Sequence, residues 1–153
     1  MLKNLTFDLI LTDLKAQTHK KCFREIAHAL ADEAGLDPAV LTRLFIYKEK
    51  RQTSAIGQGV AILDLQSVRV SQPLLVLAVL DHTVDFSAPD EKPVDLVAAI
   101  LSPLTDGAVH LQRISGVSRL LRDQALCQSL REAKDRDTLR LLLMAPDKRL
   151  YAA

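Results

Sequence analysis

The stretch LLVLAVL, Leu74–Leu80, decides the fold class. It is apolar throughout and rich in valine and leucine, which is typical of a central strand covered on both faces of a sheet. Two further apolar runs, Gly59–Leu65 and Val94–Leu101, predict additional strands. The polar segment DHTVDFSAPDEKP between the second and third runs contains two prolines and predicts a turn-rich connection.

Helical patterns lie on both sides of these strands in the sequence. The first covers Lys20–Ala34 and is followed by Gly35, a residue that favours helix C-termini. The second begins at Asp37-Pro38, an N-cap followed by proline, and ends in the basic run Lys48–Arg51. In the first helix, residues at i, i+3, i+4, i+7 and i+11 form one apolar stripe. These residues are Phe23, Ile26, Ala27, Leu30 and Ala34.

The last third of the chain is predicted to be helical. The expected segments are Ala108–Arg122, Ala125–Ala133 and Thr138–Met144, the last capped by Asp137. The order of helices, strands and helices predicts an α/β fold with helices packed on a mostly buried sheet.

The length and composition predict one soluble domain, residues 1–153, because 48% of the residues are hydrophobic and 25% are charged. The net charge of +1 argues against a nucleic-acid partner, and Leu74–Leu80 is too short for a membrane-spanning helix. The first residues lack the apolar core of a signal peptide, so no membrane insertion is expected. With only two cysteines, Cys22 and Cys127, a reducing cytoplasm is the expected location.

Motifs for nucleotides, metals and serine nucleophiles are missing from the sequence. We therefore expect no cofactor and no metal site. Two polar residues remain as candidates from pattern alone. Asp64 follows an apolar strand, where a carboxylate usually marks a turn or caps an amide. His110 lies near a helix start on the apolar face, where a backbone partner at the edge of the core is the simpler interpretation.

A family resemblance favours a functional interpretation of both Asp64 and His110. KEKRQTSAIGQGVAIL, Lys48–Leu63, and VDFSAPDEKPVDLVAAILSP, Val84–Pro103, resemble IIA components of the bacterial phosphoenolpyruvate-dependent sugar phosphotransferase system. The similarity is to the fructose/mannitol type and, within it, to the nitrogen-regulatory IIA proteins. It extends over Leu5–Leu143. It implies a three-layer α/β/α sandwich, with helices on both sides of a mixed sheet of about four to five strands.

The resemblance also implies a site and partners. In this family a histidine within a Pro-His-Gly triplet receives a phosphoryl group from the phosphocarrier protein HPr or its nitrogen-branch relative. Nitrogen-regulatory members dock onto sensor kinases, potassium transport systems and similar targets. In this chain Leu63 stands at the proline and Asp64 at the phosphoacceptor histidine, while His110 matches the family's second histidine. The resemblance further implies phosphate or partner binding at a set of nearby positions. These are Lys48, Thr53, Ser54, Gly57 and Gly59.

The substitution predicts a change in chemistry. A neutral imidazole is a good phosphoryl acceptor, whereas an aspartate, with an ordinary pKa of about 3.9, is an anion that repels the incoming group. Three interpretations follow: a regulatory, protein-binding module without phosphotransfer; a phosphocarrier that uses Asp64 or His110; and a structural or oligomeric module that kept the fold alone. The sequence favours the first and leaves open whether any enzymatic transfer survives.

Overall fold

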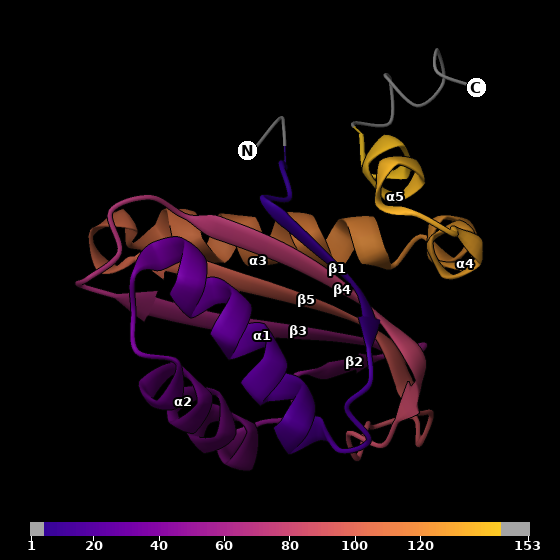
Figure 1. Cartoon of the computed structure of the whole chain (residues 1–153), viewed down its shortest axis with the longest axis horizontal. Coiled ribbons are helices and arrows are strands. Elements are labelled where there is room, and N and C mark those ends of the chain that lie inside the picture. The colour runs from indigo at the N-terminus through magenta and orange to yellow at the C-terminus, as the bar shows by residue number, and fades with distance from the viewer. Residues whose placement is uncertain (1–4, 145–153) are drawn as a thin grey trace.

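The computed structural model describes residues 5–144, which form a five-stranded mixed sheet between two layers of helices (Figure 1). The strand order is β1-β4-β5-β3-β2. β1 pairs with β4 in parallel and β3 with β5 in parallel, whereas β4–β5 and β2–β3 are antiparallel. The strands are β1 (Leu9–Leu14), β2 (Ala55–Gly57), β3 (Val60–Ser67), β4 (Leu74–Val84) and β5 (Val94–Pro103).

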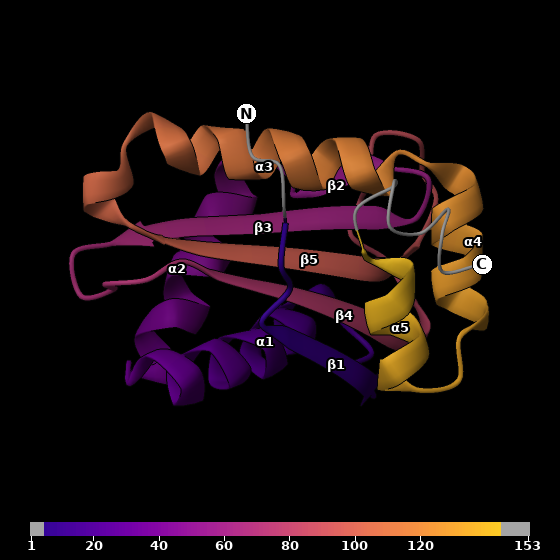
Figure 2. The same ribbon diagram turned by 90° about the horizontal axis from the view of Figure 1, so that it is seen from above.

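Two helices cover one face of the sheet, and three helices cover the other (Figures 1 and 2). α1 and α2 form the first layer, and α3 lies along β3 and β5 on the opposite face, with α4 and α5 beside it. A short 3-10 turn, η1, joins β5 to α3. The helical segments are α1 (His19–Ala34), α2 (Pro38–Arg51), η1 (Leu104–Asp106), α3 (Ala108–Leu121), α4 (Gln124–Glu132) and α5 (Arg136–Leu142).

Local capping fixes where the helices begin and end. The Thr18 side chain accepts a hydrogen bond from the Lys21 amide at the start of α1, and Gly35 takes the left-handed conformation that ends the helix. Asp37 caps α2 in front of Pro38, as the sequence predicts. These caps satisfy amides and carbonyls that the terminal turns leave unpaired.

Strand alternation divides the interior into two apolar cores, because successive side chains point to opposite faces. Phe23 and Phe45 pack with Leu63 in the core beneath α1 and α2. Ile62 and Leu77 belong to the core beneath α3, α4 and α5. The predicted three-layer α/β/α fold with a mixed sheet is therefore confirmed.

Several predictions about individual elements need correction. β1 was missed, because Leu9–Leu14 is short and contains polar Thr12 and Asp13. β4 is an interior strand as predicted, but the middle strand of the sheet is β5. The final helix begins earlier than expected and is capped by Asp135, which accepts from the Thr138 amide, rather than by Asp137.

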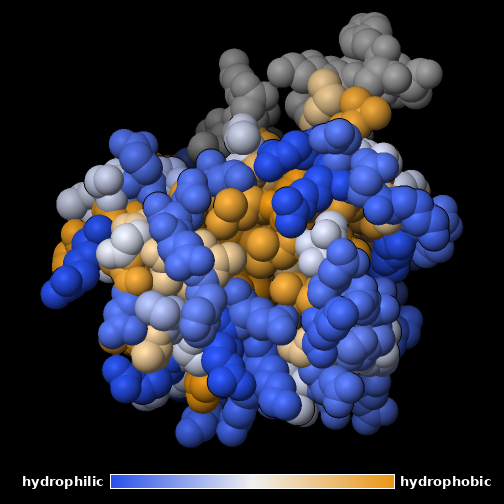
Figure 3. Space-filling view, viewed as in Figure 1, coloured by the Kyte–Doolittle hydropathy of each residue, from blue (hydrophilic) through white to orange (hydrophobic). Residues whose placement is uncertain are grey.

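Apolar surface gathers over β1, between α1 and α5 (Figure 3). Leu9, Leu11 and Leu14 of β1 are only partly buried. β1 is one edge strand of the sheet, whereas β3, which carries Asp64, lies next to the other edge strand, β2. This apolar surface therefore lies toward the opposite edge of the sheet from Asp64. Within residues 5–144, no helix combines the length and hydrophobicity that a membrane span requires. The predicted domain span, 1–153, includes residues 1–4 and 145–153, which lie outside the described residues.

Candidate functional site

Asp64 lies within β3, where the strand loses its outer neighbour. β2 pairs with β3 at Ala55 and Gly57, and a further backbone hydrogen bond on this side runs from the Ile62 amide to the Ser54 carbonyl. Beyond that point, no strand of the described part of the chain covers the outer edge of β3. Asp64 shares the orientation of Ile62, toward α3. The interpretation of Asp64 as a strand-end carboxylate was wrong, because β3 continues to Ser67.

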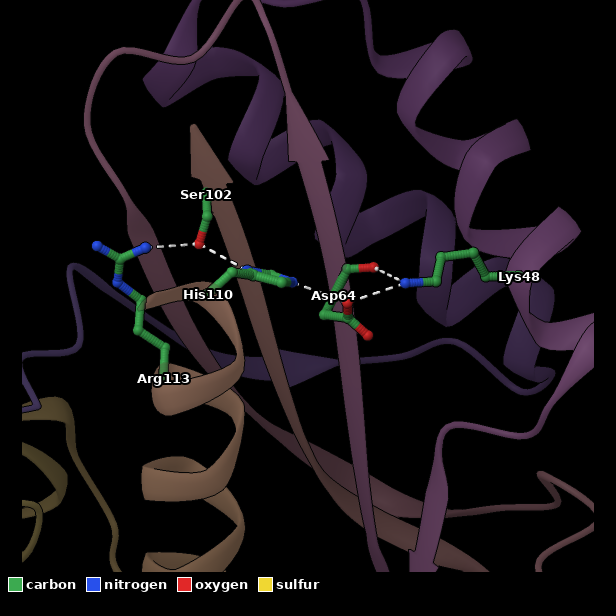
Figure 4. Close-up of polar contacts among 5 residues, drawn as sticks. All are labelled: Lys48, Asp64, Ser102, His110 and Arg113. Atoms are coloured by element: carbon green, nitrogen blue, oxygen red, sulfur yellow. Dashed lines mark hydrogen bonds and ion pairs between the residues drawn. The ribbon is translucent and has the colours of Figure 1, made fainter. Parts of the chain in front are cut away.

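Two donors from opposite layers meet at one oxygen of Asp64 (Figure 4). Lys48 of α2 reaches over the sheet edge, and its Nζ lies 2.9 Å from Asp64 Oδ2 and 3.0 Å from the Asp64 carbonyl oxygen. From the other face, His110 Nε2 of α3 lies 2.9 Å from the same Oδ2. The three side chains differ in exposure: 47% for Lys48, 26% for Asp64 and 4% for His110. The structure thus brings together Asp64 and His110, the two residues that the sequence singled out, with Lys48 from the predicted set of binding positions.

Behind His110, the polar chain continues into the protein. His110 Nδ1 lies 2.7 Å from Ser102 Oγ, and Arg113 Nη1 donates to the same hydroxyl oxygen over 2.8 Å. Arg113 also forms an ion pair with Asp106, at 2.6 Å. Ser102 is fully buried at the end of β5. The prediction that a backbone group satisfies the His110 ring was therefore wrong, since both ring nitrogens have side-chain partners.

The surroundings of Asp64 stabilise its charged form. Burial alone raises the pKa of a carboxyl, because it removes water from the anion. Here the hydrogen bonds from Lys48 and His110, together with the charge of Lys48, outweigh burial and hold the pKa of Asp64 below its ordinary value. Asp64 is thus an anion at neutral pH.

This shift predicts how acid affects stability. The unfolded chain protonates Asp64 near its ordinary pKa of about 3.9, whereas the folded protein protonates it at lower pH. The contribution of ionised Asp64 to folding is therefore complete above about pH 5 and is lost as the pH falls through the folded-state pKa. We expect the stability difference between the wild type and Asp64→Asn to be constant from pH 7 to 5 and to shrink below pH 4. Urea unfolding across this range measures it; a difference that stayed constant down to pH 3 would contradict the shift.

Thr53 and Ser54 support the chain that leads into β2 rather than pointing at Asp64. Thr53 Oγ1 donates to Glu49 Oε2 over 3.0 Å, and the Ser54 amide donates to Glu49 Oε1 over 2.9 Å. The Ser54 carbonyl accepts from the Ile62 amide, which joins this segment to β3. Among the described residues, the buried Ser54 hydroxyl has no hydrogen-bond partner. Their predicted part in phosphate or partner binding is not tested by these contacts.

Gly57 ends β2 and Gly59 lies in the turn between β2 and β3, at the far end of β3 from Asp64. Gly59 has φ of +81°, and a Cβ there would lie 2.7 Å from Arg131 Nη2. Arg131 closes the turn by donating to the Gln58 carbonyl and to Asp95. At about 3.3 Å per residue, Gly59 is about 16 Å from Asp64 along the strand. The structure does not bring these glycines to the site, and it gives them a role in the geometry of the turn.

Three polar residues of the site were not predicted from the sequence: Ser102, Arg113 and Asp106. Ser102 follows an apolar strand and looks like the first residue of a turn, while Arg113 looks like an ordinary surface residue of a helix. A faint signal existed, because residues three apart share one face of a helix and Arg113 follows His110 at that spacing. In the part of the chain that the structure describes, no three His, Cys, Asp or Glu side chains lie together as a potential metal site.

The fold and this site define a class of α/β/α proteins in which a side chain of β3, here Asp64, faces a histidine of α3, here His110. The chain matches the family described as "Phosphoenolpyruvate-dependent sugar phosphotransferase system, EIIA 2" over residues 3–145. It is also 33% identical over 139 residues to a nitrogen regulatory protein of Bradyrhizobium diazoefficiens, with 91% of each chain covered. The protein therefore belongs to the EIIA 2 family of the phosphotransferase system.

Solved structures agree with this assignment. The nitrogen regulatory protein IIA-Ntr of Neisseria meningitidis superposes with a TM-score of 0.82 at 27% identity, covering 88% of this chain and 92% of that one. The IIA mannitol protein of Escherichia coli superposes with a TM-score of 0.74 at 21% identity, covering 88% and 94%. The second likeness concerns the fold alone, and it confirms the predicted mannitol-type IIA fold.

Proposed function

We propose that this protein is a nitrogen-regulatory type of IIA protein that works as a regulatory, protein-binding module without phosphotransfer. Asp64 would occupy the position of the family's phosphoacceptor histidine. One observation carries the proposal: both donors at the site, Lys48 Nζ and His110 Nε2, converge on Asp64 Oδ2, and the pKa of Asp64 is lowered. The site is thus built around a group that is an anion at neutral pH.

Such an anion is poorly suited to accept a phosphoryl group from a phosphohistidine. Phosphoryl transfer depends on positioning and on stabilisation of the negative charge of the transferred group. Here the cation of Lys48 is already paired with Asp64, so less positive charge is available for the incoming group. Ionised Asp64 instead resembles the charge of a phosphorylated residue, although a phosphoryl group carries about −1.5 to −2 charges.

The surface next to the site supports a docking role. Leu104 of η1 and Leu111 of α3 have exposed fractions of 52% and 64%, and they lie in the segments that carry Asp106 and His110. The mannitol IIA protein of Escherichia coli is known in complex with phosphorylated IIB. We propose that the corresponding face of this chain binds an HPr-type carrier as a vestige, and regulatory targets such as sensor kinases or potassium transport systems.

Intact-protein mass measurement tests the proposal. The protein is incubated with phosphoenolpyruvate, the first enzyme of the phosphotransferase system and an HPr-type carrier. Its intact mass is then measured under non-acidic conditions. We expect no added phosphate, because the anionic Asp64 repels the incoming phosphoryl group and already holds the nearby cation of Lys48.

Stoichiometric phosphate that disappeared in Asp64→Ala or His110→Ala would contradict the proposal and favour a working phosphocarrier. A pull-down from the source cell addresses the structural-module alternative. In that experiment Asp64→Ala should reduce the recovery of partners, whereas Asp81→Ala, at an exposed position of β4, serves as the matched control. Equal recovery from the two variants would leave Asp64 without a docking role.

A further inference from the structure

We infer that Arg113 and Ser102 form a donor relay that holds His110 with its proton on Nε2, so that His110 always presents a donor to the group at position 64. The inference deepens the proposed function, since it says how the site would hold an anion at this position. The protonation pattern itself is independent of whether phosphotransfer occurs.

The direction of the relay follows from the chemistry of its first member. A guanidinium group has only donors, so Arg113 Nη1 must donate to Ser102 Oγ, 2.8 Å away. The Ser102 oxygen therefore acts as an acceptor toward Arg113. Its hydroxyl hydrogen is left for its other neighbour, His110 Nδ1, at 2.7 Å. A hydroxyl that donates to Nδ1 requires this nitrogen to carry no proton.

Burial makes this direction matter. Ser102 is 0% exposed and His110 is 3% exposed, so water does not readily replace a missing partner. If Nδ1 carried the proton, Ser102 would accept from both His110 and Arg113, and its own hydrogen would be left in a buried place without the acceptor that Nδ1 provides. An unsatisfied buried donor is destabilising, because it has lost its hydrogen bonds to water and gained none in return. The arrangement with the proton on Nε2 satisfies every member.

The position of Arg113 is itself fixed. Its Nη1 also bonds Asp106 of η1, at 2.6 Å, and the Arg113 side chain is only 11% exposed (Figure 4 shows Arg113 directed at Ser102). One nitrogen with two hydrogens thus serves Asp106 and Ser102 together. Because η1 and the first turns of α3 are adjacent in the chain, this ion pair anchors the relay locally.

The relay acts on position 64 from behind His110. Its donors run in one direction, from Arg113 to Ser102, to His110 and then to Asp64 Oδ2. Hydrogen bonds in such a chain polarise one another, so a cation at one end strengthens the donor at the other. Ser102 and Arg113 are therefore positioning residues: they do not reach position 64, and they prepare His110 to stabilise an anion there.

Asp64→Ala separates the relay from the effect of Asp64, because an ionised carboxylate by itself demands a proton on Nε2. The measurement is the long-range ¹H–¹⁵N NMR spectrum of the His110 ring at alkaline pH, where imidazole rings are neutral. With Ser102 and Arg113 in place, we expect the Nε2-protonated ring of His110 to be about ten times more abundant than the Nδ1-protonated ring in Asp64→Ala. This ratio is the effect of about one hydrogen bond. Predominance of the Nδ1-protonated ring in Asp64→Ala would overturn the inference.

Arg113 variants in the Asp64→Ala background complete the test. Arg113→Met leaves Ser102 free to accept from the ring, so a substantial Nδ1-protonated fraction is expected to appear. Arg113→Lys keeps a cationic donor and should suppress that fraction again. Arg119→Met, at an exposed position of the same helix, is the matched control and should change nothing.

If Arg113→Met and Arg119→Met gave the same ring spectrum, the relay would be refuted. The backbone amide spectrum of each variant checks that the fold is kept. A phosphorylated wild-type protein would contradict the proposed function but would leave the ring measurement valid, so the two failures are distinguishable.

Discussion

Asp64→His is expected to convert the protein from one that takes up no phosphate into one that carries close to one phosphoryl group per chain. The introduced imidazole would stand where both Lys48 Nζ and His110 Nε2 already converge. With the aspartate anion gone, the charge of Lys48 becomes available to the incoming phosphoryl group, and His110 can donate to it. A neutral imidazole also restores the nucleophile. Intact-protein mass measurement, with the same phosphotransferase-system proteins, detects the added phosphoryl group.

Leu63 should be left unchanged in this experiment, although the resemblance places a proline there. Leu63 is 3% exposed and pairs with Ala99 in the register of β3 and β5. The Ile62 amide faces β2, so by alternation the Leu63 amide faces β5. Proline at Leu63 would remove this ladder donor from the sheet interior.

Two controls accompany Asp64→His. Asp64→Ala should stay without phosphate, because it removes the anion but adds no nucleophile. Asp64→His combined with His110→Ala should be phosphorylated more slowly or lose the group faster. A folded Asp64→His variant that took up no phosphate would indicate that this chain lacks a docking surface for the carrier. That result would favour the structural-module interpretation over the regulatory one.

Phe23→Ala is expected to cause the largest loss of stability among the substitutions considered, about 3–5 kcal/mol. The Phe23 side chain is fully buried in α1 and meets three other rings. Its ring centroid is 5.8 Å from Phe86 in an edge-to-face arrangement, 6.3 Å from Phe45 and 5.6 Å from His19. The deletion thus opens a cavity that α1, α2 and the connection after β4 all border.

Thermal and urea unfolding measure this loss. For a chain of this size, the expected loss lowers the melting temperature by roughly 6–20 °C. Tyr47→Ala, at a position that is 57% exposed on α2, is the control and should change stability by less than about 0.5 kcal/mol. A loss below about 1 kcal/mol for Phe23→Ala would mean that the ring cluster does not hold α1 against α2. Because α2 carries Lys48, the NMR signals of Asp64 should also change in this variant.

Strong periodic segments were predicted well. The stripe of α1 is buried at Phe23, Ile26 and Leu30, and the cap at Asp37 is where the sequence indicates. The apolar residues of the second helix divide into two groups: Leu41 and Phe45 are buried, but Val40 and Leu44 are 41% and 42% exposed. Periodicity identifies apolar positions, and it does not decide which of them a neighbouring element covers.

Two histidines of α1 have different environments. His28 lies off the apolar stripe and is exposed. His19 is the first residue of α1 and is partly buried against Phe23 and Phe86. The reason is tertiary, because Phe86 comes from a loop far along the chain.

The amino-acid sequence by itself determined the layered α/β fold, the end of α1 at Gly35 and the cap of α2 at Asp37, and through family resemblance it pointed to Asp64 and His110. Those properties depend on residue type, spacing and local hydrogen bonds, which a linear pattern carries. Only the tertiary structure decided that Lys48 comes over the sheet edge onto Asp64, and that Ser102 and Arg113 stand behind His110. These contacts join residues 8, 11 and 16 positions apart that lie on different elements, so they depend on strand register and helix packing rather than on any local pattern.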